Sequence, residues 1–334
     1  MNKRYIIIAV SLALAMACLL SGCSKSNNAS SAGGSGSGRD SASSPPAGPV
    51  TLKVKWIPGK EYAMRMEETE TIEFNLPDEP KPVKQVRKMT MDYTVSVLKE
   101  LADGGRELEC SFTVIKTSSS EGKRQTLDFD STRDTAPDAD NPVASMFHRL
   151  IGERVRLVLD AEGRVVRVDG YDAFVDRVAG SRQAQMKAMF RQMFSEDNLK
   201  QIGSVADGLP DHPVKAGDHW PVNLELPNPI GIIVIHLKDT FKGWESRAGR
   251  QCVRIAFEGD IASKPGPNSA NTSARLEKGV ISGQTWFDPA LGMMVQSDDA
   301  EDMPLQIKNR GRVISGQIHR TASRTLLDVT DIGK

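Results

Sequence analysis

The sequence has no excess of either charge and contains few aromatic residues and few histidines. The 334 residues carry 43 basic and 43 acidic side chains, so the formal net charge is zero. A chain without a basic excess is not typical of proteins that bind nucleic acid or anionic membranes. Aromatic residues make up only 5% of the chain, and there are only 5 histidines. The charge balance therefore predicts no nucleic-acid partner.

Recognisable catalytic and cofactor motifs are also missing. The sequence has no Walker loop, no zinc-finger spacing and no glycine-rich dinucleotide fingerprint. Ser282 and Ser315 lack the glycine two residues earlier that a nucleophile elbow requires. His212, Asp218 and His219 form the best candidate cluster, because two imidazoles and a carboxylate could hold zinc. The prolines and glycine around them favour a plain turn into a strand, so we predict no metal site, no cofactor and no catalytic residue.

Cysteine is rare as well, with only 4 in the chain. Cys110 shares a strand face with apolar neighbours, which points it into the core. The apolar neighbours of Cys252 alternate in the opposite phase, which places that thiol on the other face. An exported protein meets oxidising conditions, so a disulfide between them is one alternative. The second alternative is two unpaired thiols, and it is favoured because the two cysteines are predicted on opposite faces.

The N-terminus carries the pattern of an export signal. A short cationic start is followed by an uncharged apolar run of about 15 residues, shorter than the ~20 that span a bilayer as a helix. The run ends in Leu20-Ser21-Gly22-Cys23, which resembles the lipobox of bacterial lipoproteins. The resemblance implies that the chain is cut before Cys23 and that this residue carries acyl groups such as palmitate. The alternative is an uncleaved membrane anchor with an incidental cysteine.

A serine-, glycine- and proline-rich segment follows the cysteine. Residues 23–49 contain almost no large apolar side chain, so they cannot bury enough surface to offset the entropy of ordering. We expect residues 1–22 to be a signal peptide and residues 23–49 a lipidated, disordered tether. In the Gram-negative lipoproteins that this pattern resembles, an aspartate after the cysteine signals retention in the inner membrane, and this chain has Ser24 there, which resembles an outer-membrane address. The membrane lipid around an acylated Cys23 is thus an expected partner, in an outer membrane facing the periplasm or the cell surface.

The pattern of residues 50–334 predicts mainly β-strands. Tyr62, Met64, Met66, Ile72 and Phe74 alternate with polar residues, which is the period of a half-buried strand. Similar patterns recur as far as Val329, and glycine-containing turns separate them. We predict a mainly β fold: a long-stranded, twisted antiparallel sheet, or two similar β lobes at 50–170 and 209–334, with a small helical insertion at 171–203.

Helices are few in this pattern. Asn141-Pro142 can cap and begin one that runs to Ile151. Residues 171–203 form the main helical block, with breaks near Gly180 and at Ser195. Its methionine and phenylalanine stripe is either an adaptable binding face or the side of a helix packed on a sheet, and the second is the simpler interpretation.

Three aromatic turn segments link the sequence to a family. The segments are Trp56–Tyr62, Leu209–Trp220 and Trp286–Gly292. They resemble a large group of exported bacterial proteins that share a domain of unknown function, which implies fold and location but no mechanism. The long strands beside a helix also resemble the half-barrel lipoprotein carriers of the envelope. The four tryptophans at strand ends either plug the rim of the β core or stack on a sugar.

Three functions remain open from the sequence. The first is a non-catalytic envelope lipoprotein whose curved sheet binds an apolar or peptide-like ligand. The second is a structural or assembly component that contacts other envelope proteins through strand edges. The third, least favoured, is a metal-dependent hydrolase that uses His212, Asp218 and His219.

Overall fold

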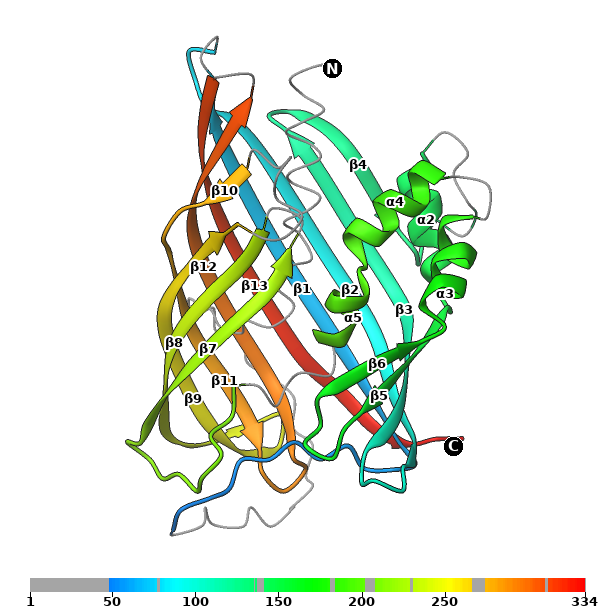
Figure 1. The fold of residues 1–334 in the computed structure, drawn as a ribbon, viewed down its shortest axis with the longest axis vertical. Helices are drawn as coiled ribbons and strands as arrows, with labels where there is room; N and C mark the ends of the chain where they lie inside the picture. Colours follow the sequence, from blue (N-terminus) through cyan, green and yellow to red (C-terminus); the bar gives the residue numbers. More distant parts are fainter. Residues whose placement is uncertain are drawn as a thin grey trace, which may run out of the picture.

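A single, strongly curved antiparallel sheet forms the body of the protein (Figure 1). The computed structural model describes residues 48–333, except 77–78, 135, 137–140, 181–183, 202–207, 229–230, 266–273 and 310–311. The predicted signal peptide, Cys23 and the tether as far as residue 47 lie outside the described residues. No helix in the described part is long and apolar enough to cross a membrane.

Thirteen strands and four helices are described. The strands are β1 (Lys60–Asn75), β2 (Val83–Glu100), β3 (Arg106–Glu121), β4 (Arg124–Asp130), β5 (Arg154–Leu159), β6 (Val165–Asp169), β7 (His219–Asn228), β8 (Gly231–Arg247), β9 (Arg250–Lys264), β10 (Ala274–Leu276), β11 (Gly279–Asp288), β12 (Met293–Asn309) and β13 (Arg312–Asp331). The helices are α2 (Pro142–Leu150), α3 (Tyr171–Ala179), α4 (Ala184–Met193) and α5 (Glu196–Gln201). The predicted mainly β fold with a small helical insertion is confirmed.

Both strand-rich portions of the chain belong to the same 13-stranded sheet. Its order is β6-β5-β3-β2-β1-β13-β12-β11-β9-β8-β7, with β4 beside β3 and β10 beside β12. The two portions therefore lie side by side, joined where β1 pairs with β13 from Lys60↔Asp331 to Asn75↔Ser315. Of the two predicted arrangements, the structure has the continuous sheet.

Side-chain carboxylates fix the turns that the sequence indicated. Asp103 Oδ1 accepts a hydrogen bond from Gly105 N at 3.0 Å, and Asp160 Oδ1 accepts one from Arg164 N at 2.9 Å. Asp288 Oδ1 does the same for Ala290 N at 2.9 Å. These aspartates mimic a backbone acceptor within the turn, which explains why short connections can join such long strands.

The helices lie on the concave side of the sheet, over its β2–β3–β5 end (Figure 1). Asn141 caps α2 as predicted, because its Oδ1 accepts a hydrogen bond from Ala144 N at 3.1 Å. The phenylalanine stripe packs on the sheet: the ring centroids of Phe174 and Phe190 are 5.5 Å apart, and those of Phe112 and Phe194 are 5.8 Å apart. The simpler interpretation of that stripe is confirmed.

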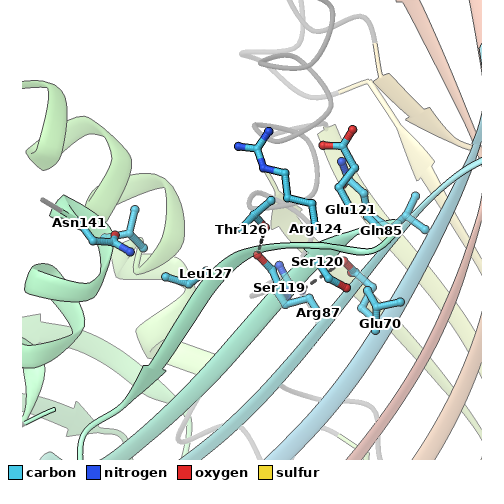
Figure 2. Close-up of a pocket in the computed structure, with 13 residues that line it drawn as sticks. Glu70, Gln85, Arg87, Ser119, Ser120, Glu121, Arg124, Thr126, Leu127 and Asn141 are labelled. Atoms are coloured by element: carbon cyan, nitrogen blue, oxygen red, sulfur yellow. Dashed lines mark hydrogen bonds and ion pairs between the residues drawn. The ribbon is translucent and has the colours of Figure 1, made fainter.

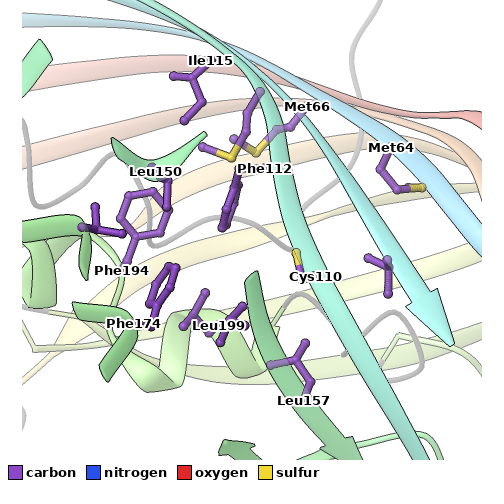
Figure 3. Close-up of a cluster of buried hydrophobic side chains, with 14 of the residues drawn as sticks. Met64, Met66, Cys110, Phe112, Ile115, Leu150, Leu157, Phe174, Phe194 and Leu199 are labelled. Atoms are coloured by element: carbon purple, nitrogen blue, oxygen red, sulfur yellow. The ribbon is translucent and has the colours of Figure 1, made fainter. Parts of the chain in front are cut away.

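This packing makes the helix-covered cluster, the largest apolar cluster of the described residues (Figure 3). Its strands supply Met64, Met66, Val95, Leu108, Cys110, Phe112, Ile115 and Leu157, and its helices supply Met146, Phe147, Leu150, Phe174, Val178, Phe190 and Leu199. Sheet and helices form two layers around one core, the usual way for a half-apolar sheet to bury its inner face.

Both cysteines are buried and unpaired, as the sequence favoured. Cys110 points into the helix-covered cluster, where burial raises the pKa of its thiol to about 12. Cys252 packs with Trp286 and Val295 in a small cluster on the other face of the sheet. The guanidinium carbon of Arg247 lies 4.4 Å from the centroid of the Trp286 ring and covers this cluster. The prediction that the two thiols lie on opposite faces is confirmed.

Candidate binding site

A second apolar cluster lies on the same concave face and contains residues from strands only. On β1, Ile72 and Phe74 continue the alternation that places Met64 and Met66 in the helix-covered cluster. The strand-only cluster consists of Ile72, Phe74, Leu226, Ile233, Ile235, Phe257, Ile261, Ala274, Leu276, Ile281, Met303, Leu305, Ile307, Ile314 and Ile318. Within the described part of the chain, no helical residue belongs to it.

Charged side chains separate these two clusters. On the inner face of β1, Glu68 and Glu70 stand between Met66 and Ile72, and both carboxylates are buried. We call this set the polar belt; its buried members are Glu68, Glu70, Arg87, Asp299, Glu301, Arg320 and Arg324. Long-range strand register assembles it, because the pairing of β1 with β13 joins the N-terminal strands β1 and β2 to the C-terminal strands β12 and β13.

The pairing of neighbouring strands places opposite charges across from each other. Glu70 on β1 lies opposite Arg320 on β13 and opposite Arg87 on β2. On the far side of β13, Arg320 lies opposite Glu301 of β12. Cross-strand neighbours of this kind are close enough for side chains to interact directly.

Two arginines hold the belt together. Arg320, which is only 2% exposed, lies 2.8 Å from Glu301 Oε1 through its Nη1 and 3.1 Å from Glu68 Oε2 through its Nε. Arg87 Nη2 is shared between Glu68 Oε1 at 2.9 Å and Glu70 Oε1 at 3.3 Å. Buried charges of this kind remain ionised only where partners replace the water they lose.

Burial nonetheless changes the titration of several carboxyls. Desolvation raises the pKa of Glu70 to about 7, against the opposing effect of Arg87. Desolvation also raises the pKa of Asp299 well above its usual value. Asp239, on the inner face of β8, has its pKa raised to about 7 by burial alone. These groups mark the interior of the curve as a place where negative charge is unfavourable.

A cavity of about 260 Å³ adjoins the polar belt (Figure 2). It lies between the inner faces of β1, β2 and β3, the strand β4 and the start of α2. Its lining is Glu70, Ile72, Gln85, Val86, Arg87, Ser119, Ser120, Glu121, Arg124, Thr126, Leu127, Asn141 and Val143. Ile72 belongs both to this lining and to the strand-only cluster.

The residues of the candidate zinc cluster have separate local roles. His212 is exposed, and its Nδ1 lies 2.8 Å from Asp211 Oδ1. Asp218 Oδ2 accepts a hydrogen bond from Lys215 N at 2.9 Å within the turn that precedes β7, and His219 is the exposed first residue of that strand. No group of three potential metal ligands comes together in the described residues.

Trp56 and Trp220 are buried in apolar clusters of the core and Trp244 packs against one of them, whereas Trp286 lies in the small cluster on the other face of the sheet. Trp56, Trp220 and Trp286 are buried, and Trp244 packs partly buried against the core. The ring of Trp56 meets Tyr62 edge-on with centroids 5.3 Å apart. Trp220 Nε1 donates a hydrogen bond to Gly208 O at 3.0 Å.

The polar belt is the feature that sequence reasoning missed. The alternation along β1 runs unbroken through Glu68 and Glu70, so two acidic residues stand at positions that the pattern assigns to the core. That mismatch is a usable signal for a buried polar group. Its partners Arg87 and Arg320 cannot be recognised from the sequence, because they depend on which strands are neighbours.

Comparisons with known proteins give distant structural likenesses. A structure titled lipid–protein interactions in lipovitellin has a TM-score of 0.45 and 11% identity, over 84% of this chain and 26% of that chain. The chain therefore spans about a quarter of that lipovitellin chain. An exported protein of Bacteroides fragilis with a YmcC-like fold has a TM-score of 0.26 and 12% identity, over 85% of this chain and 100% of its own.

A DUF1329 family protein of Desulfovibrio piger has a TM-score of 0.14 and 12% identity, over 81% of this chain and 87% of its own. All three TM-scores lie below 0.5, so these likenesses carry no argument about function. The search of curated proteins gave no match. A protein-family model does match residues 103–294, which are more than half of the sequence. The chain thus belongs to the family of unknown function DUF6263.

Proposed function

We propose that the protein is a lipid-anchored, non-catalytic component of the bacterial cell envelope whose strand-only cluster binds an apolar ligand. An acylated Cys23 would anchor it in the membrane, and the tether would hold the folded part beside an outer membrane, in the periplasm or at the cell surface. The proposal of a ligand rests on one observation: an apolar face that extends from β7 to β1 has no described helix over it.

The argument for a ligand is the need for a second layer. A sheet that is apolar on one face must bury that face against something. Over β2, β3 and β5 the helices α2–α5 are that layer (Figure 1). Over the strand-only cluster, the described residues supply only neighbouring strands of the same curved sheet. The cluster members are already at most 8% exposed, and an apolar ligand along the inside of the curve would add a second layer to the strands that bury them.

The chemistry of this face indicates the class of ligand. Its side chains are mostly isoleucine, leucine and methionine, with Phe74 and Phe257 as the only aromatic members. Branched and flexible aliphatic side chains suit an acyl chain or an apolar peptide, which need close contact rather than directed hydrogen bonds. The polar belt would limit how far such a ligand extends, because its buried charges oppose apolar contact.

A pair of adjacent residues on β11 offers a matched test. Ile281 points into the strand-only cluster, whereas Val280 is 59% exposed on the other face. The purified full-length protein is incubated with a dodecanoic acid that carries a diazirine, irradiated, and digested for mass spectrometry. We expect labels on inner residues of β8, β9 and β12, and a several-fold loss of labelling in Ile281→Trp but not in Val280→Trp. Circular dichroism confirms that both variants are folded.

Two results would contradict the ligand proposal. One is labelling spread evenly over both faces of the sheet. The other is equal labelling of the two tryptophan variants, since only one of them fills the proposed site.

The anchor has its own test. Intact mass of the protein from its native host should show a chain that begins at Cys23 and carries acyl groups. The Cys23→Ser variant should lose both the cleavage and the acyl mass. A chain that still begins at Met1, with a free thiol at residue 23, would refute the anchor without bearing on the ligand.

The assembly alternative receives less support from the strand edges. The edge strand β7 contains Pro221 and Pro227, which have no N–H group to donate to an added strand. The opposite edge strand, β6, is only 5 residues long. Short or proline-containing edges are features by which sheets avoid pairing with other chains.

A further inference from the structure

The cavity beside the polar belt has the composition of a small binding site. At about 260 Å³ it is slightly below the usual range of roughly 300–1,000 Å³ for ligand pockets. Ile72, Leu127 and Val143 give it apolar walls, while Arg124 lies at its exposed side (Figure 2). A mainly apolar lining with a few polar groups is typical of sites for small molecules.

One polar group in this lining lacks a partner. Glu70 is 2% exposed, and its Oε2 has no hydrogen-bond partner among the described residues. Its other oxygen shares Arg87 Nη2 with the carboxylate of Glu68. A buried carboxylate oxygen without a donor is costly, and such groups are usually satisfied by a donor that the protein or a ligand supplies.

The charge count of the polar belt points to the sign of the missing donor. Among the described residues it holds four carboxylates, and three guanidinium groups face them: those of Arg87, Arg320 and Arg324. With every group ionised, the belt would carry one negative charge in excess, and the raised pKa values of Glu70 and Asp299 show that the folded protein disfavours that charge while it has no further cation. A cation beside Glu70 would balance that charge and donate to Oε2 at the same time.

We propose that this cavity binds a small molecule with a primary ammonium group and a short apolar body. The ammonium group donates to Glu70 Oε2, and the apolar body lies between Ile72, Leu127 and Val143. This site adjoins the strand-only cluster, with which it shares Ile72, but it does not depend on a ligand on the rest of that face. The cavity would recognise its ligand by charge and hydrogen bonding, whereas the strand-only cluster would recognise its ligand by apolar contact.

Hexylammonium is a suitable probe because it is small, soluble and chemically simple. Binding to the full-length protein is measured by isothermal titration calorimetry at pH 8, above the raised pKa of Glu70, which is about 7. Hexanol and hexanoate serve as probes of similar length with no positive charge. We expect hexylammonium to bind at least tenfold more tightly than either.

Three variants locate the site. Glu70→Gln removes the charge with little change in shape and should weaken hexylammonium binding at least tenfold. Thr126→Trp, at the exposed side of the cavity, should block entry while leaving the polar belt untouched, so it tests the site even if Glu70→Gln folds poorly. Glu73→Gln is the matched control: the same substitution three residues along β1, where Glu73 pairs with Lys84 at 3.1 Å on the outer face. It should leave the affinity within twofold.

Several outcomes would overturn the proposal. Equal affinity for hexylammonium, hexanol and hexanoate would show that charge plays no part. Equal affinity of all the variants would place the binding elsewhere. Because the labelling test above uses Ile281 on another part of the face, either proposal can fail without the other.

Discussion

The two halves of the concave face share strands, alternation and apolar character but differ in what lies over them. On β1, Met64 and Met66 face helices, whereas Ile72 and Phe74, a few residues along the same strand, face none that the structure describes. The helix-covered half is a completed core. The strand-only half is closed by strands of the same curved sheet, with no described helix over it. We expect stability to reside mainly in the first half, and the proposed ligand site lies in the second.

The polar belt lies between the two halves and separates their apolar clusters. Buried ion pairs seldom add net stability over well-packed apolar side chains, but loss of one partner leaves an uncompensated charge. We therefore interpret the belt as a device that keeps the two apolar clusters separate. Four predictions test this comparison, from the largest expected effect to the smallest.

The largest effect is expected at the centre of the belt. Arg320→Leu removes the cation that pairs with Glu301 and one of the two that pair with Glu68, and we expect a loss of about 3–5 kcal/mol in the free energy of unfolding. Lys84→Met, which breaks an exposed pair with Glu73, should cost below about 1 kcal/mol. Urea unfolding followed by circular dichroism measures both. Equal costs would mean that the belt does not behave as a buried ionic network.

A single substitution made in each half compares them directly. Leu108 faces the helix-covered cluster and Leu305 the strand-only cluster, and both are almost fully buried. Replacement of leucine by alanine in a core costs about 2–5 kcal/mol, with more lost where the surroundings cannot relax. We expect Leu108→Ala to lower the free energy of unfolding by about 4 kcal/mol and Leu305→Ala to lower it by about 2 kcal/mol, both measured on ligand-stripped protein. A larger loss for Leu305→Ala would reverse the assignment of stability.

The third prediction concerns pH and the strand-only half. Burial raises the pKa of Asp239 to about 7 in the folded protein, so the folded state holds its proton more tightly than the unfolded state. That contribution to stability is fully present below about pH 4 and is lost as the pH rises through 7.

Asp239→Asn should therefore raise the free energy of unfolding at pH 8 by roughly 2 kcal/mol relative to the wild type, and change it little at pH 4. Glu70 and Asp299 shift wild-type stability in the same direction, but the variant retains both. The difference between the two pH profiles thus isolates Asp239. A constant difference at all pH values would count against a buried, titrating carboxyl.

The smallest effect is expected at the start of the helical layer. Asn141→Ala removes the side-chain cap of α2 and should cost about 1 kcal/mol. Hydrogen exchange should increase in the first turn of α2, with no change in β8 or β9. Faster exchange in both halves would show that the helical layer also supports the strand-only half.

Local patterns predicted most of the elements. Alternation identified the strands, aspartate–glycine turns identified their connections, and Asn141-Pro142 identified the start of α2. The opposite phases around Cys110 and Cys252 correctly placed the two thiols on opposite faces. Each of these features depends on neighbours within a few residues, which is the range over which a sequence pattern carries physical information.

The arrangement of the sheet and the candidate sites depended on longer-range contacts. Nothing near Glu70 indicates that Arg320 will lie opposite it, since some 250 residues separate them in the chain. The cavity likewise needs β1, β4 and α2 together. The histidines that attracted a metal hypothesis are close in sequence, yet the turn before β7 gives each a separate role. Proximity along the chain was a poor guide to proximity in space.

The pairing of β1 with β13 has a consequence for how the protein is made. One edge of β1 pairs with the strand that comes last in the chain, so that edge stays unpaired until the C-terminal strand has reached the compartment in which the protein folds. Until then the edge of β1 is open to wrong partners. Maturation should thus be least tolerant of interruption late in synthesis, and a chain cut short before β13 should be recognised as a substrate by chaperones and proteases.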